Sequence, residues 1–191
     1  MIKNIILDVG GVFFDDSKTN IERLLNKNCN NIYKIAYGKD FKKALLGEIS
    51  VREHIHRLKN EPEYLDIEYI LKKENLIYSY PLIKNNFEYI KKLKERGYHL
   101  YLLTNITEDI YHYINHLIDI HQIFDGGIFS YREHLIKPDN AIYQLLLERY
   151  HLMKEETIFF DDKKKNVDKA NQLGIKSFVF TSIQDIENHL V

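Results

Sequence analysis

The sequence predicts an α/β fold, a doubly wound (Rossmann-like) parallel sheet core with an inserted α-helical cap. Across residues 81–191, short apolar runs that suit buried strands alternate with segments of helical periodicity. This alternation is typical of a parallel sheet with right-handed crossovers. One earlier apolar run, Ile5–Leu7, is separated from these elements by residues 20–75, where only helical periodicity is found. We therefore expect a core domain of residues 1–13 and 81–191 and a helical cap domain of residues 14–80.

The first strand is predicted at Ile5–Leu7, because this apolar run leads directly into a loop with two glycines. Four more strands are predicted at residues 98–103, 128–129, 157–160 and 178–180. The helices between them are expected to begin near Pro81, Thr107 and Lys137-Pro138. Gly97 suits the position just past a helix end, and Ser182 and Asp185 have the spacing of a capping box for the last helix.

The composition favours a folded chain that binds neither nucleic acid nor membrane. The apolar fraction of 45% and the aromatic fraction of 13% exceed what a disordered chain carries. The 27 Lys+Arg and 28 Asp+Glu give a formal charge of −1, whereas general nucleic-acid binding depends on a basic field. No apolar run approaches the length of a membrane span, and residues 5–14 lack the features of a signal peptide. Because the one cysteine, Cys29, forms no internal disulfide, we expect a cytoplasmic protein.

Polar residues follow the predicted strands at the places where an open parallel sheet binds ligands. They are Asp8, Thr104-Asn105, Lys137 and Asp161-Asp162. Carboxylates suit Mg²⁺, while a hydroxyl, an amide and an ammonium group donate to phosphate oxygens. A carboxylate that attacks phosphorus forms an aspartyl-phosphate intermediate. The pattern therefore indicates phosphate chemistry at this edge of the sheet.

Four motifs in this order resemble those of the haloacid dehalogenase-like (HAD) hydrolase superfamily over nearly the whole chain. They are Ile6-Leu7-Asp8-Val9-Gly10-Gly11-Val12, Leu102-Leu103-Thr104-Asn105, Ile136-Lys137-Pro138, and Phe159-Phe160-Asp161-Asp162 with Lys163-Lys164-Lys165-Asn166. The resemblance implies that Asp8 is the nucleophile and that Lys137 is catalytic. It also implies two further groups of residues. Phosphate-binding residues would be Val9, Gly10, Thr104, Asn105 and Lys137; metal ligands would be Asp8, the Gly10 carbonyl and Asp162, with Asp161 and Asn166 in support.

The chain departs from the family pattern at Gly10. The family's phosphatases usually carry a second Asp at this position, as general acid and then base. Such acid–base help is worth about 10²–10⁴ in rate, and a glycine supplies none. Some relatives with a similar Asp-x-Gly-x-Val loop resemble sugar-phosphate phosphatases, so Gly10 is compatible with an enzyme. We expect Lys163, Lys164 and Lys165 to lie on a solvated helix face.

The sequence favours a Mg²⁺-dependent phosphatase that acts on a small phosphorylated metabolite through Asp8. One alternative is a slow or non-catalytic HAD-like regulatory protein that holds a phospho-ligand, which Gly10 supports. A second is a 2-haloacid dehalogenase, which needs neither a metal nor an Asp pair. A phosphoacceptor receiver domain is disfavoured, because its acidic pair lies near the first strand and it has no large cap. The resemblance favours sugar phosphates as substrates, and the sequence leaves the oligomeric state open.

Overall fold

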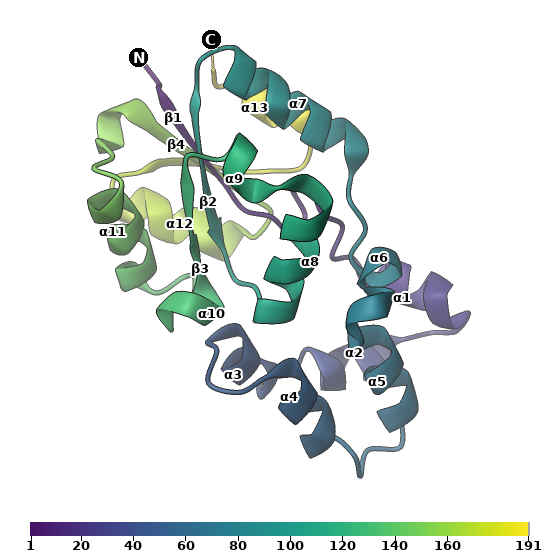
Figure 1. Ribbon diagram of the computed structural model, residues 1–191. Helices are drawn as coiled ribbons and strands as arrows, with labels where there is room; N and C mark the ends of the chain where they lie inside the picture. The colour runs from purple at the N-terminus through teal and green to yellow at the C-terminus, as the bar shows by residue number, and fades with distance from the viewer. Residues whose placement is uncertain (191) are drawn as a thin grey trace.

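Five parallel strands form a single sheet in the computed structural model, which describes residues 1–190 (Figure 1). The strands are β1 Asn4–Leu7, β2 His99–Thr104, β3 Gly126–Phe129, β4 Thr157–Asp161 and β5 Lys176–Val179. Their order is β3-β2-β1-β4-β5, and each neighbouring pair is parallel. The predicted doubly wound parallel sheet is confirmed.

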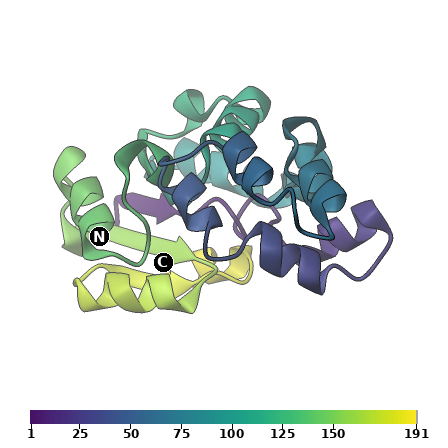
Figure 2. The same ribbon diagram turned by 90° about the horizontal axis from the view of Figure 1, so that it is seen from below.

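Successive strand residues point to opposite sides of the sheet, so both faces of this sheet are apolar. Helices therefore cover both faces. Ile5 and Leu7 of β1 belong to one hydrophobic cluster, whereas Ile6 belongs to another. The first cluster is completed by α7 Lys84–Glu95, α8 Glu108–Ile118, α9 Ile120–Ile123 and α13 Ile183–Glu187. The second is completed by α11 Asn140–Arg149 and α12 Lys164–Gln172. Figure 2 shows the two groups of helices on opposite sides of the strands.

The order in which strands are added to the sheet reverses at β1. After β1 the chain adds β2 and then β3 on one side, and it crosses to the other side of β1 to form β4 and β5. Leu7 at the end of β1 is paired with Phe160 near the end of β4. The residues that follow these two strands are therefore neighbours at the point where sheets of this kind bind ligands.

The segment between β1 and α7 contains helices and no strand over residues 20–75, as predicted, and has a hydrophobic cluster of its own. Its elements are α1 Lys18–Leu25, α2 Asn30–Ala36, α3 Phe41–Leu45, α4 Val51–Arg57, α5 Tyr64–Leu71, the 3₁₀ helix Lys73–Asn75 and α6 Leu76–Ser79. These helices, referred to below as the cap, lie at one end of the sheet (Figure 1). The domain boundaries 1–13, 14–80 and 81–191 stay a prediction.

The two segments that link the cap to the core run side by side. Asp15 N–H donates to the Pro81 carbonyl at 2.9 Å, and Ile83 N–H donates to the Phe13 carbonyl at 2.8 Å. This pairing keeps Pro81 out of a helix, so the prediction that a helix begins there is wrong; α7 begins at Lys84. A second attachment lies at α10 Ser130–Glu133, where the Ser130 hydroxyl donates to the Leu45 carbonyl of α3 at 2.6 Å.

Other predicted boundaries shift by a few residues. The third predicted helix, α11, begins at Asn140 rather than at Lys137-Pro138, because the Lys137 backbone is held by the Asn105 side chain instead. Strand β5 ends at Val179, so Phe180 lies just outside it. The capping box of Ser182 and Asp185 is confirmed.

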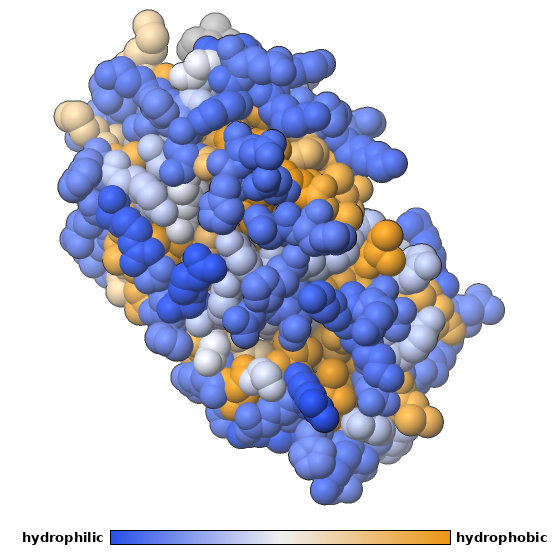
Figure 3. All heavy atoms as spheres, in the orientation of Figure 1, coloured by the Kyte–Doolittle hydropathy of each residue, from blue (hydrophilic) through white to orange (hydrophobic). Residues whose placement is uncertain are grey.

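The outer surface is mainly polar. Figure 3 shows a largely hydrophilic face on which apolar residues form separate patches over the core and over the cap. No helix within residues 1–190 combines the length and the apolarity that a bilayer crossing requires.

Candidate active site

Asp8 lies directly after β1 and is buried, with 4% of its surface exposed. Its Oδ1 atom accepts the Val9 N–H at 2.7 Å. The chain then turns sharply, and Gly11 adopts a positive φ of 70°. A Cβ atom at Gly11 would lie 2.6 Å from Cγ of Asp162. Glycine at this position therefore lets the loop after β1 approach the loop after β4.

The Lys137 ammonium group joins the ends of three strands. Its Nζ atom lies 3.0 Å from Oδ1 of Asp8, 2.6 Å from Oδ2 of Asp161 and 2.6 Å from the Leu103 carbonyl. The Lys137 side chain is 1% exposed, so these contacts are made away from water. Burial by itself would raise the pKa of Asp8, but Lys137 and the more distant Lys163 together hold that pKa below its ordinary value. Asp8 is therefore an ionised carboxylate.

Asn105 positions the lysine, a role that the sequence did not predict. Its side-chain amide donates to the Lys137 carbonyl at 3.0 Å, and its side-chain oxygen accepts the Lys137 N–H at 2.9 Å. This reciprocal pair fixes the backbone that carries the ammonium group. Thr104, at the end of β2, is buried and lines the same pocket as Asp8 and Lys137.

Asp161 and Asp162 are adjacent in sequence but differ in their surroundings. Asp161 accepts hydrogen bonds from the Asn166 side chain at 2.9 and 3.0 Å and from the Lys163 N–H at 2.8 Å, besides its ion pair with Lys137. Oδ1 of Asp162 is buried and has no hydrogen-bond partner within residues 1–190. The two carboxylates are therefore not equivalent: Asp161 is held in place, and Asp162 is available.

The arrangement of carboxylates fits a divalent cation. One ligand oxygen from each of Asp8, Asp161 and Asp162 lies within 4.8 Å of the others. The pKa of Asp162 is raised to about 6, mainly by burial. Lys163 lowers this pKa, and the nearby carboxylates of Asp8, Asp16 and Asp161 raise it. A bound cation relieves this repulsion, and oxygen donors of this kind suit Mg²⁺.

The structure brings the predicted site residues together. Asp8, Gly10, Thr104, Asn105, Lys137 and Asn166 line one pocket of about 480 Å³, and Asp161 and Asp162 contact this group or lie beside it. Val9 differs from the others, because its side chain is in the core and its N–H is bound to Asp8. The individual roles of these residues stay predictions.

Asp16 is a site residue that the sequence did not reveal. A Cβ atom at Gly10 would lie 3.0 Å from Oδ2 of Asp16 and 3.1 Å from the Tyr80 hydroxyl. The Asp16 carboxylate thus occupies the space into which a side chain at position 10 would extend. Its position depends on the turn after Gly11 and on the paired linkers, so no sequence pattern relates it to Gly10.

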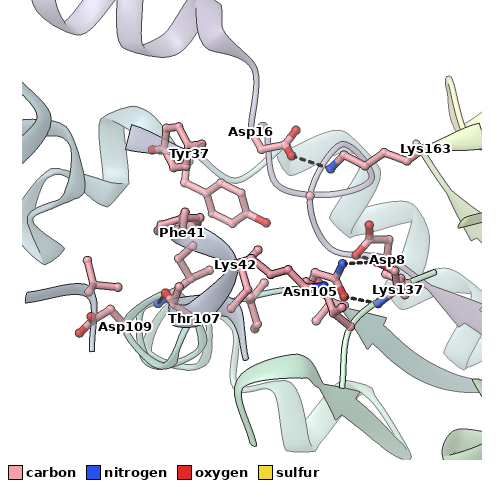
Figure 4. A pocket seen from close by; sticks show the side chains of 18 of the residues that line it. Asp8, Asp16, Tyr37, Phe41, Lys42, Asn105, Thr107, Asp109, Lys137 and Lys163 are labelled. Atoms are coloured by element: carbon pink, nitrogen blue, oxygen red, sulfur yellow. Dashed lines mark hydrogen bonds and ion pairs between the residues drawn. The ribbon is translucent and has the colours of Figure 1, made fainter. Parts of the chain in front are cut away.

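Lys163, directly before α12, forms an ion pair with this carboxylate. Its Nζ atom lies 3.3 Å from Oδ2 of Asp16 and 3.7 Å from Oδ1 of Asp162, as Figure 4 shows for the first pair. Although burial would lower it, the pKa of Lys163 is raised by Asp8, Asp16 and Asp162. Lys163, Lys164 and Lys165 are exposed, as expected, but Lys163 and Lys165 also line the pocket.

Replacing Lys137 by Met should destabilise the fold strongly. The change leaves Asp8 and Asp161 buried without their shared cation, which should cost about 3–5 kcal/mol in the free energy of unfolding. The matched change Lys163→Met removes a half-exposed ammonium group and should cost about 0–1 kcal/mol. Urea denaturation measures both. A loss below about 1 kcal/mol for Lys137→Met would show that the two carboxylates do not depend on this lysine.

A family model described as haloacid dehalogenase-like hydrolase matches residues 5–180. A sesquiterpene phosphatase of Aspergillus oryzae is 34% identical over 86 residues, which are 45% of this chain and 44% of that protein. A phosphorylated carbohydrates phosphatase of Thermotoga maritima is 36% identical over 59 residues, 31% of this chain and 27% of that protein. The chain thus spans less than half the length of these curated relatives.

Solved structures share the fold over the whole chain. The magnesium complex of a HAD family enzyme from Bacteroides thetaiotaomicron has a TM-score of 0.78 at 21% identity, covering 98% of this chain and 97% of that one. The family-model match agrees with the order of the motifs and with the doubly wound sheet. The protein is a member of the haloacid dehalogenase-like hydrolase family.

Proposed function

We propose that this chain is a Mg²⁺-dependent phosphatase that hydrolyses a small phosphomonoester through an aspartyl-phosphate on Asp8. One observation carries the proposal: an ionised, buried Asp8 shares Lys137 with Asp161 and lies beside an Asp162 oxygen that accepts no hydrogen bond. The two phosphatase relatives support the reaction class. Because one is named for sesquiterpenes and the other for phosphorylated carbohydrates, they support no single substrate class.

The reaction has two steps. An oxygen of Asp8 attacks phosphorus, the bond from phosphorus to the ester oxygen breaks, and the leaving oxygen takes a proton. Water then hydrolyses the acyl phosphate and restores Asp8. Lys137, Thr104 and Asn105 line the pocket where they would donate to the phosphoryl oxygens. Mg²⁺, held by Asp8, Asp162 and the Gly10 carbonyl, would neutralise charge on the phosphoryl group.

Asp16 is the group that we propose to supply the proton. Its carboxyl group takes the place of a side chain at Gly10 and lines the same pocket as Asp8. In the first step it would donate a proton to the leaving oxygen, and in the second it would accept one from the attacking water. This role removes the main support for a non-catalytic regulatory protein, which was the lack of an acid at position 10.

The buried oxygen of Asp162, which accepts no hydrogen bond, also disfavours a 2-haloacid dehalogenase, since that reaction needs no metal ligand. We expect the substrate to be the one small-molecule partner of this site, with neither nucleic acid nor membrane involved. The free Cys29 is consistent with the expected cytoplasmic location.

Asp8→Asn should abolish phosphate release and leave the fold intact. The amide is nearly isosteric with the carboxylate but does not attack phosphorus. Phosphate release from p-nitrophenyl phosphate measures the activity, and circular dichroism checks the fold. Asp15→Asn is the control, because the Asp15 carboxylate accepts the Ser17 N–H and an amide oxygen preserves that bond. Retention of more than a few per cent of activity by Asp8→Asn would exclude the nucleophile.

Asp162→Asn should act mainly through the metal. We expect a higher Mg²⁺ concentration at half-maximal rate, because one of few carboxylate ligands is lost. Asp161→Asn should reduce activity by about 10–100-fold with a smaller change in the Mg²⁺ requirement, since Asp161 acts through Lys137 and Asn166. Mg²⁺ titrations of both folded variants compare the two. A larger shift for Asp161→Asn would reverse the assignment within the pair.

Asp16→Asn should slow the hydrolysis of alkyl phosphates by about 10²–10⁴ and that of p-nitrophenyl phosphate much less. The reason is that nitrophenolate leaves without a proton, whereas an alkoxide needs one. Rates across phosphate esters of graded leaving-group pKa measure this dependence. The double variant Gly10→Asp/Asp16→Gly moves the carboxyl group to position 10 and should recover part of the alkyl-ester rate. Equal losses with both ester types would rule out proton donation by Asp16.

A further inference from the structure

The pocket above Asp8 has two chemically different parts. Its floor carries the polar groups at the strand ends, among them Asp8, Thr104 and Lys137. Its walls on the cap side are mainly apolar and aromatic. They include Tyr33, Tyr37, Phe41, Leu45, Leu71 and Leu76. Figure 4 shows Tyr37 and Phe41 across the pocket from Asp8 and Lys137.

The polar groups that the cap offers to a ligand in this space are the Asp16 carboxylate, Lys42, Ser79 and the phenol hydroxyls of Tyr33, Tyr37 and Tyr80. The Ser79 hydroxyl already donates to carbonyl oxygens of Ile70 and Asn75. Lys42 lines the pocket but has an exposed side chain. Burial raises the pKa of Tyr37 well above its ordinary value, so its hydroxyl stays neutral. Because aliphatic and aromatic side chains make up most of the cap lining, the cap side suits a mainly apolar group.

We infer that the substrate is a phosphomonoester of an apolar alcohol, an alkyl, prenyl or aryl phosphate, rather than a sugar phosphate. This inference rests on the proposed function and names its substrate class. The phosphate would lie on the polar floor, and the organic group would lie against the cap. An apolar group gains free energy by leaving water for such walls. The several hydroxyls of a hexose would lose their water there, with mainly phenol hydroxyls, Lys42, Thr107 and Asp109 as partners.

The size of the cavity agrees with this class. A cavity of about 480 Å³ lies within the range of about 300–1,000 Å³ that holds organic ligands of moderate size. A phosphate group alone would leave the cap side of this space unfilled. The expectation of sugar phosphates, which came from the resemblance, stays a prediction, and the inference drawn from the cap lining competes with it.

A series of esters tests the inference. We expect kcat/KM to rise from methyl to butyl, octyl and geranyl phosphate and to be lowest for hexose phosphates. Leu45→Asn, at a half-buried position of the cap wall, should lower kcat/KM for octyl phosphate by about ten-fold or more, mainly through KM. The same variant should lower kcat/KM for methyl phosphate by a clearly smaller factor, because a methyl group buries little surface against the cap wall. The control Leu65→Asn changes an exposed leucine of α5 and should have no effect on either ester.

The outcomes separate the inference from the function on which it rests. Hexose phosphates that are hydrolysed as well as octyl phosphate would overturn the substrate class and leave the phosphatase proposal intact. Release of no phosphate from any ester, p-nitrophenyl phosphate included, would overturn the phosphatase proposal. In that case thermal-shift titration with octylphosphonate decides the inference. Octylphosphonate should bind at least ten-fold more tightly than inorganic phosphate, and equal binding would overturn it.

Discussion

The buried ammonium group of Lys137 is the interaction on which the rest of the site depends. Three carboxylates meet at the ends of β1 and β4, and two of them contact this one cation. Without it, mutual repulsion and burial would favour protonation of these carboxylates or movement of the loops apart. Its position is fixed in turn by the Asn105 side chain and the Leu103 carbonyl. The cation therefore links the stability of the strand ends to the charge state of Asp8.

The cap contributes to the site through its linker as well as through its walls. Backbone hydrogen bonds of Asp15 and Ile83 hold together the two segments that link the cap to the core. This pairing places Asp16 beside the loop after β1. The position of Asp16 beside Gly10 and Lys163 follows from that path. The same cap helices form apolar walls opposite the polar floor. One insertion thus supplies both a carboxylate beside Gly10 and the surface that we propose selects the organic group.

Much of the fold was predictable from local pattern. Apolar runs that end in polar residues determined the strands, and the helical periodicity of residues 20–75 determined the cap. Errors occurred where long-range hydrogen bonds override local preference, as at Pro81 and at the start of α11. The predicted residues of the candidate site lie together because parallel strands end at the same edge of a sheet.

The sequence by itself determined the fold class, the order of the strand-end motifs and the set of carboxylates with their lysine. Each of these depends on which types of residue stand at the ends of the strands, and parallel strands already bring those ends to one edge of the sheet. Only the tertiary structure decided that Asp161 is held while Asp162 is available, that Asp16 fills the space beside Gly10, and that the cap walls are apolar. These features depend on which segments of distant sequence come into contact. Local periodicity specifies which face of a helix is apolar but does not specify which cavity that face lines.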